Sequence, residues 1–181
     1  MIGFVFAPSR RQITMEMASL ICRNVKGIGR VGVFVNAPLS EVIQIVRQCR
    51  LDFVQLHGRE SPEYCRKVRI PVIKAFQIGD GFSIERISNF DAAYILCDSL
   101  TPGCLGGSGV AFDWHKAKTV LQQIKMPVLI AGGLAPHNVK TAINILRPAG
   151  VDVSGGVETN GIKDSLKIKE FIQAARTAEG A

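Results

Sequence analysis

The stretch Ile95–Trp114 (ILCDSLTPGCLGGSGVAFDW) decides the fold class of this chain. It contains a short apolar run that ends in Asp98, a glycine-rich loop at Gly106–Gly109, and a helix start signal at Asp113. A carboxylate at the C-terminal end of a buried strand is where parallel α/β enzymes hold an acid or a base. Because glycine has no Cβ, the loop lets backbone approach a ligand closely. The stretch therefore predicts one strand–loop–helix unit of an α/β enzyme.

The same alternation of strands and helices runs through the rest of the sequence. Its short apolar runs are continuous, which is typical of a parallel sheet covered on both faces. The predicted strands are Ile2–Phe6, Val31–Val35, Phe53–Leu56, Val72–Phe76, Ala93–Asp98, Val128–Ala131 and Val151–Ser154. Helical stripes are predicted at Val42, Ile45, Val46 and Cys49, at Val139, Ala142, Ile143 and Leu146, and at Ile168, Phe171, Ile172 and Ala175. Helix starts are predicted at Ser61-Pro62-Glu63, Asp113 and Pro136.

The turns that follow the strands distinguish between two architectures, a closed (β/α)8 barrel and an open doubly wound sheet. The first turn, Ala7–Arg11, lacks the G-x-G-x-x-G pattern of dinucleotide-binding sheets. Glycine pairs follow the last two strands, in Ala131–Leu134 and in Ser154–Glu158. Backbone N–H groups at these two turns are where barrel enzymes hold a phosphate. The sequence thus favours a phosphate-binding (β/α)8 TIM barrel.

The length of 181 residues suits one domain with a substantial core. No linker interrupts the pattern, so residues 1–181 are expected to form a single phosphate-binding TIM-barrel domain. Only seven strands are predicted, and Met1 leads directly into the first of them. We therefore expect seven of the eight βα units, with the N-terminal unit missing. Because unpaired strand edges invite pairing with another chain, an oligomer through these edges is expected.

Composition narrows the function classes. Hydrophobic content of 47% with 20% charged residues fits a soluble globular protein, and no apolar run approaches the roughly 18 residues that cross a bilayer. We see no leader segment, so a cytoplasmic location without membrane association is expected. The five scattered cysteines form no C-x-x-C pair, which favours reduced thiols. The three histidines lack ligand spacing, so no metal site is predicted.

The formal net charge of +7 favours an anionic ligand. The basic residues form no dense block, and aromatic residues do not alternate with them as in nucleic-acid stacking surfaces. A small anionic substrate is therefore the expected partner, because a positive field raises its local concentration. No nucleic-acid partner is expected.

Ordered motifs along essentially the whole chain resemble those of the phosphoribosylanthranilate isomerase family. They are Gly3–Phe6 with Ser9-Arg10-Arg11, Arg30–Asn36, Val54–Gly58, Asp98 with Gly106–Gly109 and Phe112-Asp113-Trp114, Ala131–Leu134, and Val151–Glu158. The family's eighth loop usually has a second serine where Gly155 stands here. The resemblance implies an isomerase of tryptophan biosynthesis that needs no metal or cofactor. Its reaction is an Amadori rearrangement, in which N-(5-phosphoribosyl)anthranilate becomes 1-(2-carboxyphenylamino)-1-deoxyribulose 5-phosphate.

The resemblance also implies roles for individual residues. Asp98 matches the family's general acid, which protonates the furanose ring oxygen. Arg11 matches the arginine that binds the anthranilate carboxylate through two parallel hydrogen bonds, with the adjacent Arg10 as the alternative. His57 is expected either to contact substrate or to make a structural hydrogen bond. Phosphate binding falls to Gly132, Gly133, Ser154 and Gly155.

One catalytic element of the family is missing from this sequence. The family's general base, which removes the C2 proton, is a cysteine in a Lys-Ile-Cys-Gly stretch at the end of the first strand, and no such stretch occurs here. Cys97 precedes Asp98, so strand alternation points its thiol away from the site. Cys104 lies in the loop after the strand and is a weak candidate to replace the base. The remaining cysteines lie on helical stripes and are expected in the core: Cys22, Cys49 and Cys65.

Three explanations for the missing base stay open: an upstream start, a truncated product, or lost activity with phosphate binding retained. Two other functions are weighed against the isomerase. One is another phosphate-binding barrel enzyme, such as indoleglycerol-phosphate synthase or a histidine-pathway isomerase, and Asp98 with Phe112-Asp113-Trp114 argues against it. The other is a catalytically silent phosphosugar-binding barrel, which the missing base favours and the retained Asp98 and Arg11 disfavour.

Overall fold

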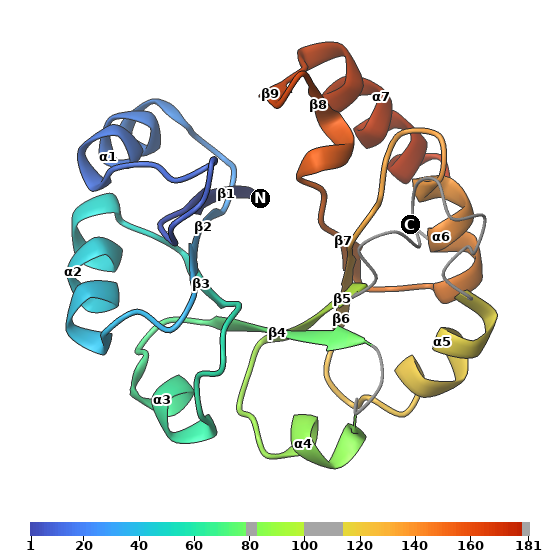
Figure 1. Cartoon of the computed structure of the whole chain (residues 1–181), viewed down its shortest axis with the longest axis horizontal. Coiled ribbons are helices and arrows are strands. Elements are labelled where there is room, and N and C mark those ends of the chain that lie inside the picture. The colour runs from blue at the N-terminus through green and yellow to red at the C-terminus, as the bar shows by residue number, and fades with distance from the viewer. Residues whose placement is uncertain (79–82, 100–113, 179–181) are drawn as a thin grey trace. The chain divides into compact units, whose positions relative to one another are not determined.

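Seven short apolar runs form the parallel strands of the computed structural model, which describes residues 1–78, 83–99 and 114–178 (Figure 1). The strands are β1 (Ile2–Val5), β2 (Arg30–Phe34), β3 (Phe53–Leu56), β4 (Val72–Ile78), β5 (Tyr94–Ser99), β6 (Val128–Ala131) and β7 (Gly150–Val151). Their order in the sheet follows their order in the chain. Pairing is parallel from β1 to β4 and from β5 to β7. Parallel strands in sequence order, with helices between them, are typical of (β/α)8 barrels.

A helix follows every one of these strands along the chain. The helices are α1 (Met15–Asn24), α2 (Leu39–Cys49), α3 (Pro62–Lys67), α4 (Ile84–Ser88), α5 (Trp114–Leu121), α6 (Val139–Leu146) and α7 (Ser165–Arg176). Between β7 and α7 lie a 3-10 turn, η1 (Gly155–Val157), and a hairpin of β8 (Glu158–Thr159) and β9 (Ile162–Lys163). Within the described residues, these helices are all too short or too polar to cross a membrane.

Local capping explains where the helices begin. The Ser61 hydroxyl accepts a hydrogen bond from the Tyr64 N–H at 3.1 Å, and Pro62 occupies the first turn, which confirms the predicted start of α3. The predicted start at Pro136 is wrong, because Pro136 lies in a turn and α6 begins at Val139, after Asn138. The Asn138 side chain fixes this turn by accepting from the Ala135 N–H at 2.8 Å. The predicted start at Asp113 lies outside the described residues.

The last strand is shorter than its apolar sequence suggests. The strand predicted over Val151–Ser154 is present but too long at its C-terminal end, since β7 comprises Gly150–Val151. The Asp152 N–H still donates to the Ile130 carbonyl at 2.8 Å, after which the chain turns into η1. The glycines that follow Ser154 therefore shape a turn rather than extend the strand, which is what a ligand-binding loop needs.

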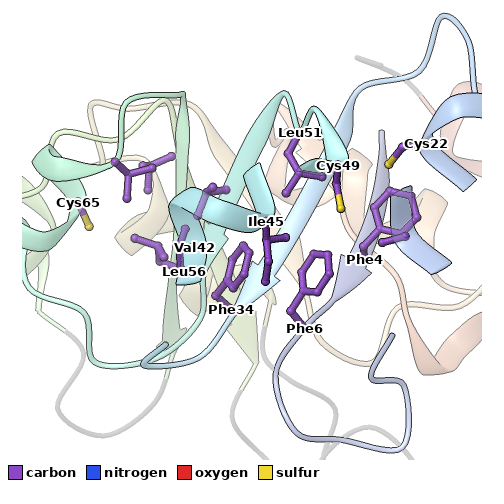
Figure 2. Packing of buried hydrophobic residues seen from close by; sticks show 14 residues of the cluster. Phe4, Phe6, Cys22, Phe34, Val42, Ile45, Cys49, Leu51, Leu56 and Cys65 are labelled. Carbon is purple, nitrogen blue, oxygen red and sulfur yellow. The ribbon is translucent and has the colours of Figure 1, made fainter. Parts of the chain in front are cut away.

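The chain divides into two compact units. Unit 1 comprises Met1–Ala75 with Asn89–Tyr94, and unit 2 comprises Phe76–Ser88 with Ile95–Ala181. In unit 1, the rings of Phe6 and Phe34 stack with their centroids 5.1 Å apart (Figure 2). The predicted stripe of α2 packs into the same core, where Val42, Ile45 and Cys49 are buried. Fully burying each large apolar side chain contributes about 1.5–3 kcal/mol, so this cluster is the main stabilising feature of unit 1.

Unit 2 has a core of its own between its strands and α6. Ile95, Leu96, Leu129 and Ile130 are buried in β5 and β6. All four residues of the predicted α6 stripe are buried with them: Val139, Ala142, Ile143 and Leu146. In α7 the predicted stripe is only partly correct, because Phe171 is buried whereas Ile172 is 43% exposed.

Candidate active site

The C-terminal ends of three strands lie side by side in unit 2 and carry the predicted acid and phosphate turns. Asp98 of β5 is paired in register with Ala131 of β6, and Ile130 is paired with Val151 of β7. Ala131 directly precedes Gly132, so the half-buried Asp98 and the first glycine turn lie at the same end of neighbouring strands. The predicted acid thus lies at the same end of the sheet as the first predicted phosphate turn.

The turn after β6 depends on glycine for its shape. Gly132 has φ +85° and Gly133 has φ +59°, two consecutive values that side-chain-bearing residues rarely adopt. The Gly133 carbonyl accepts a hydrogen bond from the Asn138 side chain at 3.0 Å, which ties the turn to the start of α6. The backbone of this turn is therefore fixed in place and carries no side chain that would cover it.

A second glycine brings the turn after β7 against the turn after β6. A Cβ on Gly156 would lie 1.8 Å from the Leu134 carbonyl oxygen and 2.8 Å from its carbonyl carbon, so only glycine fits at this position. Ser154 and Gly155 immediately precede this point of contact, and η1 begins at Gly155. The structure therefore brings all four predicted phosphate-binding residues together in unit 2. Gly156 was not among the predicted site residues, although it belongs to the glycine pair within Ser154–Glu158.

The two turns offer backbone donors for an anion. Within the described part of the chain, the N–H groups of Gly132, Gly133, Gly155 and Gly156 donate to no other residue. Lys163 lies beside them, because its ammonium donates to the Ser154 carbonyl at 2.8 Å and to the Ser154 hydroxyl at 3.3 Å. Lys163 also pairs with Glu158 at 3.0 Å. Donors and a nearby cation together suit a phosphate group.

Lys163 was not among the predicted site residues, because the hairpin that folds it back toward Ser154 was not predicted. The connection between β8 and β9 is Asn160-Gly161, with φ +52° and +80°. Asn-Gly is the strongest short signal for a two-residue hairpin turn, so the sequence did contain the information. The Glu158–Lys163 register of this hairpin then sets Lys163 beside the phosphate turns.

Unit 1 contains the residue predicted to bind the substrate carboxylate. Arg11 lies in the loop after β1, which is shaped by a hydrogen bond from the Arg11 N–H to the Ser9 hydroxyl at 3.1 Å. The Ile13 N–H donates a hydrogen bond to the Val5 carbonyl at 2.9 Å, which anchors the loop to β1. Arg11 is half-buried and Arg10 is exposed, which favours Arg11 as the more positioned guanidinium.

His57 directly follows β3 in unit 1 and is held at its ring. Its Nδ1 lies 2.9 Å from Oε1 of the buried Gln55, and its backbone N–H donates to the Phe34 carbonyl at 2.8 Å. The structural hydrogen bond is thus present, and a contact of His57 with substrate stays a prediction. The contact with Gln55 restricts the orientation of the His57 ring.

A buried ion pair beside His57 escaped the sequence analysis. Lys74 of β4 lies 3.1 Å from Glu60, and their side chains are 3% and 1% exposed. The Lys74 ammonium also donates to the carbonyls of Leu56 and Gly58, at 2.9 and 2.8 Å. The Glu60 carboxylate accepts from the N–H groups of Asn36 and Gly58, at 2.8 and 2.9 Å. The lysine inside the apolar run Val72–Phe76 was the available signal, since a buried charge needs a buried partner.

Comparison with known proteins decides the family. A family model described as N-(5'phosphoribosyl)anthranilate (PRA) isomerase matches residues 1–174. The chain belongs to this family. One relative, the N-(5'-phosphoribosyl)anthranilate isomerase of Desulforudis audaxviator, is 46% identical to this chain over 180 residues. The match covers 98% of this chain and 87% of the relative.

Solved structures of the phosphoribosylanthranilate isomerase family agree with this assignment. The crystal structure of the Thermotoga maritima enzyme matches with a TM-score of 0.85 at 42% identity, over 96% of this chain and 86% of that one. A second structure, a complex with reduced 1-(o-carboxyphenylamino)-1-deoxyribulose 5-phosphate, matches with a TM-score of 0.82 at 38% identity, over 96% and 86%. The predicted (β/α)8 fold class is confirmed, and the described residues supply seven strand–helix units.

The described cysteines are poor candidates for the family's thiolate base. Burial raises the pKa of the Cys97 thiol to about 12. Burial also raises the pKa values of the other three described thiols: Cys22, Cys49 and Cys65. All four are buried, as predicted for the three helical cysteines, and a protonated thiol does not accept a proton. Cys104 and the loop Gly106–Gly109 lie outside the described residues.

The residues predicted for the site thus fall into two groups. Asp98 and the phosphate turns belong to unit 2, whereas Arg11 and His57 stand at the C-terminal ends of β1 and β3 in unit 1. In the described ranges 1–78, 83–99 and 114–178, no group of three His, Cys, Asp or Glu residues is arranged to hold a metal ion.

Proposed function

We propose that this chain converts N-(5-phosphoribosyl)anthranilate to 1-(2-carboxyphenylamino)-1-deoxyribulose 5-phosphate in tryptophan biosynthesis. The observation that carries the proposal is the pairing of Asp98 with Ala131, directly before the glycine turn. This register sets one carboxyl group beside a cradle of backbone donors. A phosphosugar needs both, since its phosphate must be held while an acid acts on its ring.

The substrate phosphate is proposed to bind the two glycine turns of unit 2. Its oxygens accept hydrogen bonds from the N–H groups of Gly132, Gly133 and Gly155, with the Ser154 hydroxyl as a further donor. Gly156 keeps the turns together, and the Lys163 ammonium adds a positive charge next to Ser154. At the other end of the substrate, the planar Arg11 guanidinium suits the anthranilate carboxylate. His57 is proposed to contact the substrate as well.

The chemistry needs one proton donor and one proton acceptor. Asp98 gives its proton to the furanose ring oxygen, and the bond between C1 and that oxygen breaks as the nitrogen lone pair forms a C=N bond. A base then removes the C2 proton, and the electron pair of that C–H bond forms a C1=C2 double bond while the C=N electrons return to nitrogen. The resulting enol becomes the ketone by proton transfer, so no electrons leave the substrate.

The base is proposed to be the family's cysteine, supplied by a strand–helix segment that this sequence does not contain. The four described thiols are buried and protonated, so none of them suits the role. The segment would pair with β1, which stands at an edge of the sheet. Self-association through such edges and a cytoplasmic location remain predictions.

The test measures isomerase activity as the loss of fluorescence of freshly prepared phosphoribosylanthranilate. The chain is assayed alone, with a strand–helix peptide that contains Lys-Ile-Cys-Gly, and with the same peptide carrying serine in place of cysteine. We expect turnover only with the cysteine peptide, and no turnover when Asp98→Asn replaces the wild-type chain.

Two results would change the proposal. Activity of the chain alone, or with the serine peptide, would overturn the assignment of the base. Binding of a phosphosugar analogue without activity in any mixture would show a catalytically silent phosphosugar-binding protein instead.

A further inference from the structure

A concave pocket lies in unit 1 at the N-terminal ends of the strands, opposite the end that carries His57. It is formed where α1 and α2 end and where β2 begins, and its volume is 580 Å³. This volume is within the range of about 300–1,000 Å³ that is typical of small-molecule sites. The thiols of Cys22 and Cys49, labelled in Figure 2, line it together with four arginines.

The pocket carries a surplus of positive charge. Its arginines are Arg23, Arg30, Arg47 and Arg50. Among the described residues, Asp52 is the only acidic side chain that pairs with any of the four, and its partner is Arg30. The C-termini of α1 and α2 each contribute about half a negative charge. These groups together offset about two of the four positive charges, so the pocket retains a charge of about +2.

Three of the guanidinium groups are available to a ligand. Arg23 and Arg47 lie in the last turns of α1 and α2, and Arg50 follows α2 directly. Within the described ranges, these three side chains make no hydrogen bond or ion pair. Arg30 is held by Asp52, which accepts from its Nε at 2.9 Å and from its Nη2 at 3.0 Å. One fixed and three uncommitted guanidinium groups around one cavity suit a ligand with several negative charges.

The backbone at Arg50 strengthens this interpretation. Arg50 has φ +50°, a left-handed conformation at a helix end where glycine is the preferred residue. Arg147 occupies the equivalent position after α6 in unit 2, with φ +47°. The pocket beside Arg147 is otherwise lined mainly by apolar residues, including Leu121, Ile124 and Leu146. Two arginines with the same backbone geometry thus line one charged pocket and one apolar pocket.

We propose that the arginine pocket of unit 1 binds a compact ligand with two or more linked phosphate groups. A single phosphate reaches too few of the four guanidinium groups to balance the charge of the pocket. An oligophosphate chain spreads its charges across the space between α1 and α2, and each arginine can donate to it. The concave shape favours such a compact ligand over the extended backbone of a nucleic acid.

The test compares the binding of sodium tripolyphosphate to the full chain and to two matched variants by isothermal titration calorimetry. Arg50→Gly removes one charge from the pocket and places glycine where the backbone prefers it, so the fold is retained. Arg147→Gly makes the same change in unit 2. We expect Arg50→Gly to weaken binding by about tenfold, the loss expected for one charge-assisted hydrogen bond, and Arg147→Gly to leave it unchanged.

Further ligands separate the alternatives. Inorganic phosphate is expected to bind more weakly than tripolyphosphate, and a nucleoside triphosphate at least as tightly as tripolyphosphate. Absent tripolyphosphate binding, an equal loss in both variants, or no loss in Arg50→Gly would overturn the proposal. So would tight binding of a single-stranded RNA that tripolyphosphate does not displace.

Discussion

Within each unit, the loops at the C-terminal ends of neighbouring strands contact one another, and the kind of contact differs between unit 1 and unit 2. In unit 1, the loops after β2 and β3 are connected by side chains, because the Glu60 carboxylate accepts from the N–H groups of Asn36 and Gly58. In unit 2, the turns after β6 and β7 meet backbone to backbone, with Gly156 against the Leu134 carbonyl.

This difference shows why the contact in unit 1 is structural, whereas the turns of unit 2 can bind a ligand. The carboxylate of Glu60 occupies the backbone donors of unit 1 and is itself neutralised by Lys74. The glycine turns of unit 2 have no such internal acceptor among the described residues, so their N–H groups can donate to a phosphate. Similar strand ends therefore carry a buried network in one unit and a candidate binding site in the other.

The largest effect is expected from breaking the buried ion pair of unit 1. Lys74→Met leaves the Glu60 carboxylate buried without its cation, which should lower the free energy of unfolding by about 3–5 kcal/mol in urea titrations. Glu60→Gln added to Lys74→Met should recover part of the loss. Lys67→Met, which breaks the exposed pair with Glu63, is the control and should have almost no effect. An equally small effect of Lys74→Met would contradict the structural role of the pair.

The second-largest effect is expected from disrupting the backbone contact between the two turns of unit 2. Gly156→Ala places a Cβ on the Leu134 carbonyl oxygen, so the two turns must separate. We expect a destabilisation of about 1–3 kcal/mol and loss of phosphate binding, measured by thermal unfolding and by titration with inorganic phosphate. Gly3→Ala is the matched control, because its Cβ would make only an ordinary contact with Val33 at 3.8 Å. Unchanged phosphate binding by Gly156→Ala would refute the cradle.

A smaller effect is expected at Lys163, which adds charge to the same turns. Lys163→Ala should raise the dissociation constant for inorganic phosphate by about three- to tenfold, because the side chain is 47% exposed and its charge is partly screened. The fold should be unaffected. Phosphate affinity that is independent of Lys163 would show that the backbone donors act without it.

The smallest effect concerns an exposed side-chain connection in unit 1. The hydrogen bond from the Arg30 guanidinium lowers the pKa of Asp52, so the pair stabilises the fold above the unfolded pKa of about 3.9. That stability is lost as pH falls through the lower pKa of the folded state. Since the Asp52 side chain is 39% exposed, the loss should stay below about 1 kcal/mol. The check is that Asp52→Asn removes this part of the acid sensitivity in unfolding measurements.

Much of the fold follows from the sequence because it depends on local patterns. Continuous apolar runs placed all seven strands, and helical spacing identified the buried faces of α2 and α6. Ser154 illustrates the limit, since its apolar neighbours predicted a strand where the glycines after it form a turn. Strand ends depend on tertiary contacts that a local pattern does not contain.

The candidate site was predictable only where its residues lie within motifs. Gly132 and Gly133 stand out as a pair after a strand, and Asp98 ends an apolar run. Lys163 reaches Ser154 only because a hairpin folds it back. Lys74 of β4 meets Glu60, in the loop after β3, only because β3 and β4 are neighbours in the sheet. Such pairings depend on strand register and on which loops pack together, so they cannot be predicted from the local sequence around either residue.

The most direct test of the contrast between the units is an amide NMR titration of the chain with inorganic phosphate. The amide signals of Gly132, Gly133 and Gly155 should shift together, because their N–H groups donate to the phosphate. The amides of Asn36 and Gly58 should stay in place, since Glu60 already holds them. Shifts at Asn36 and Gly58 with unchanged glycine amides in unit 2 would contradict the account.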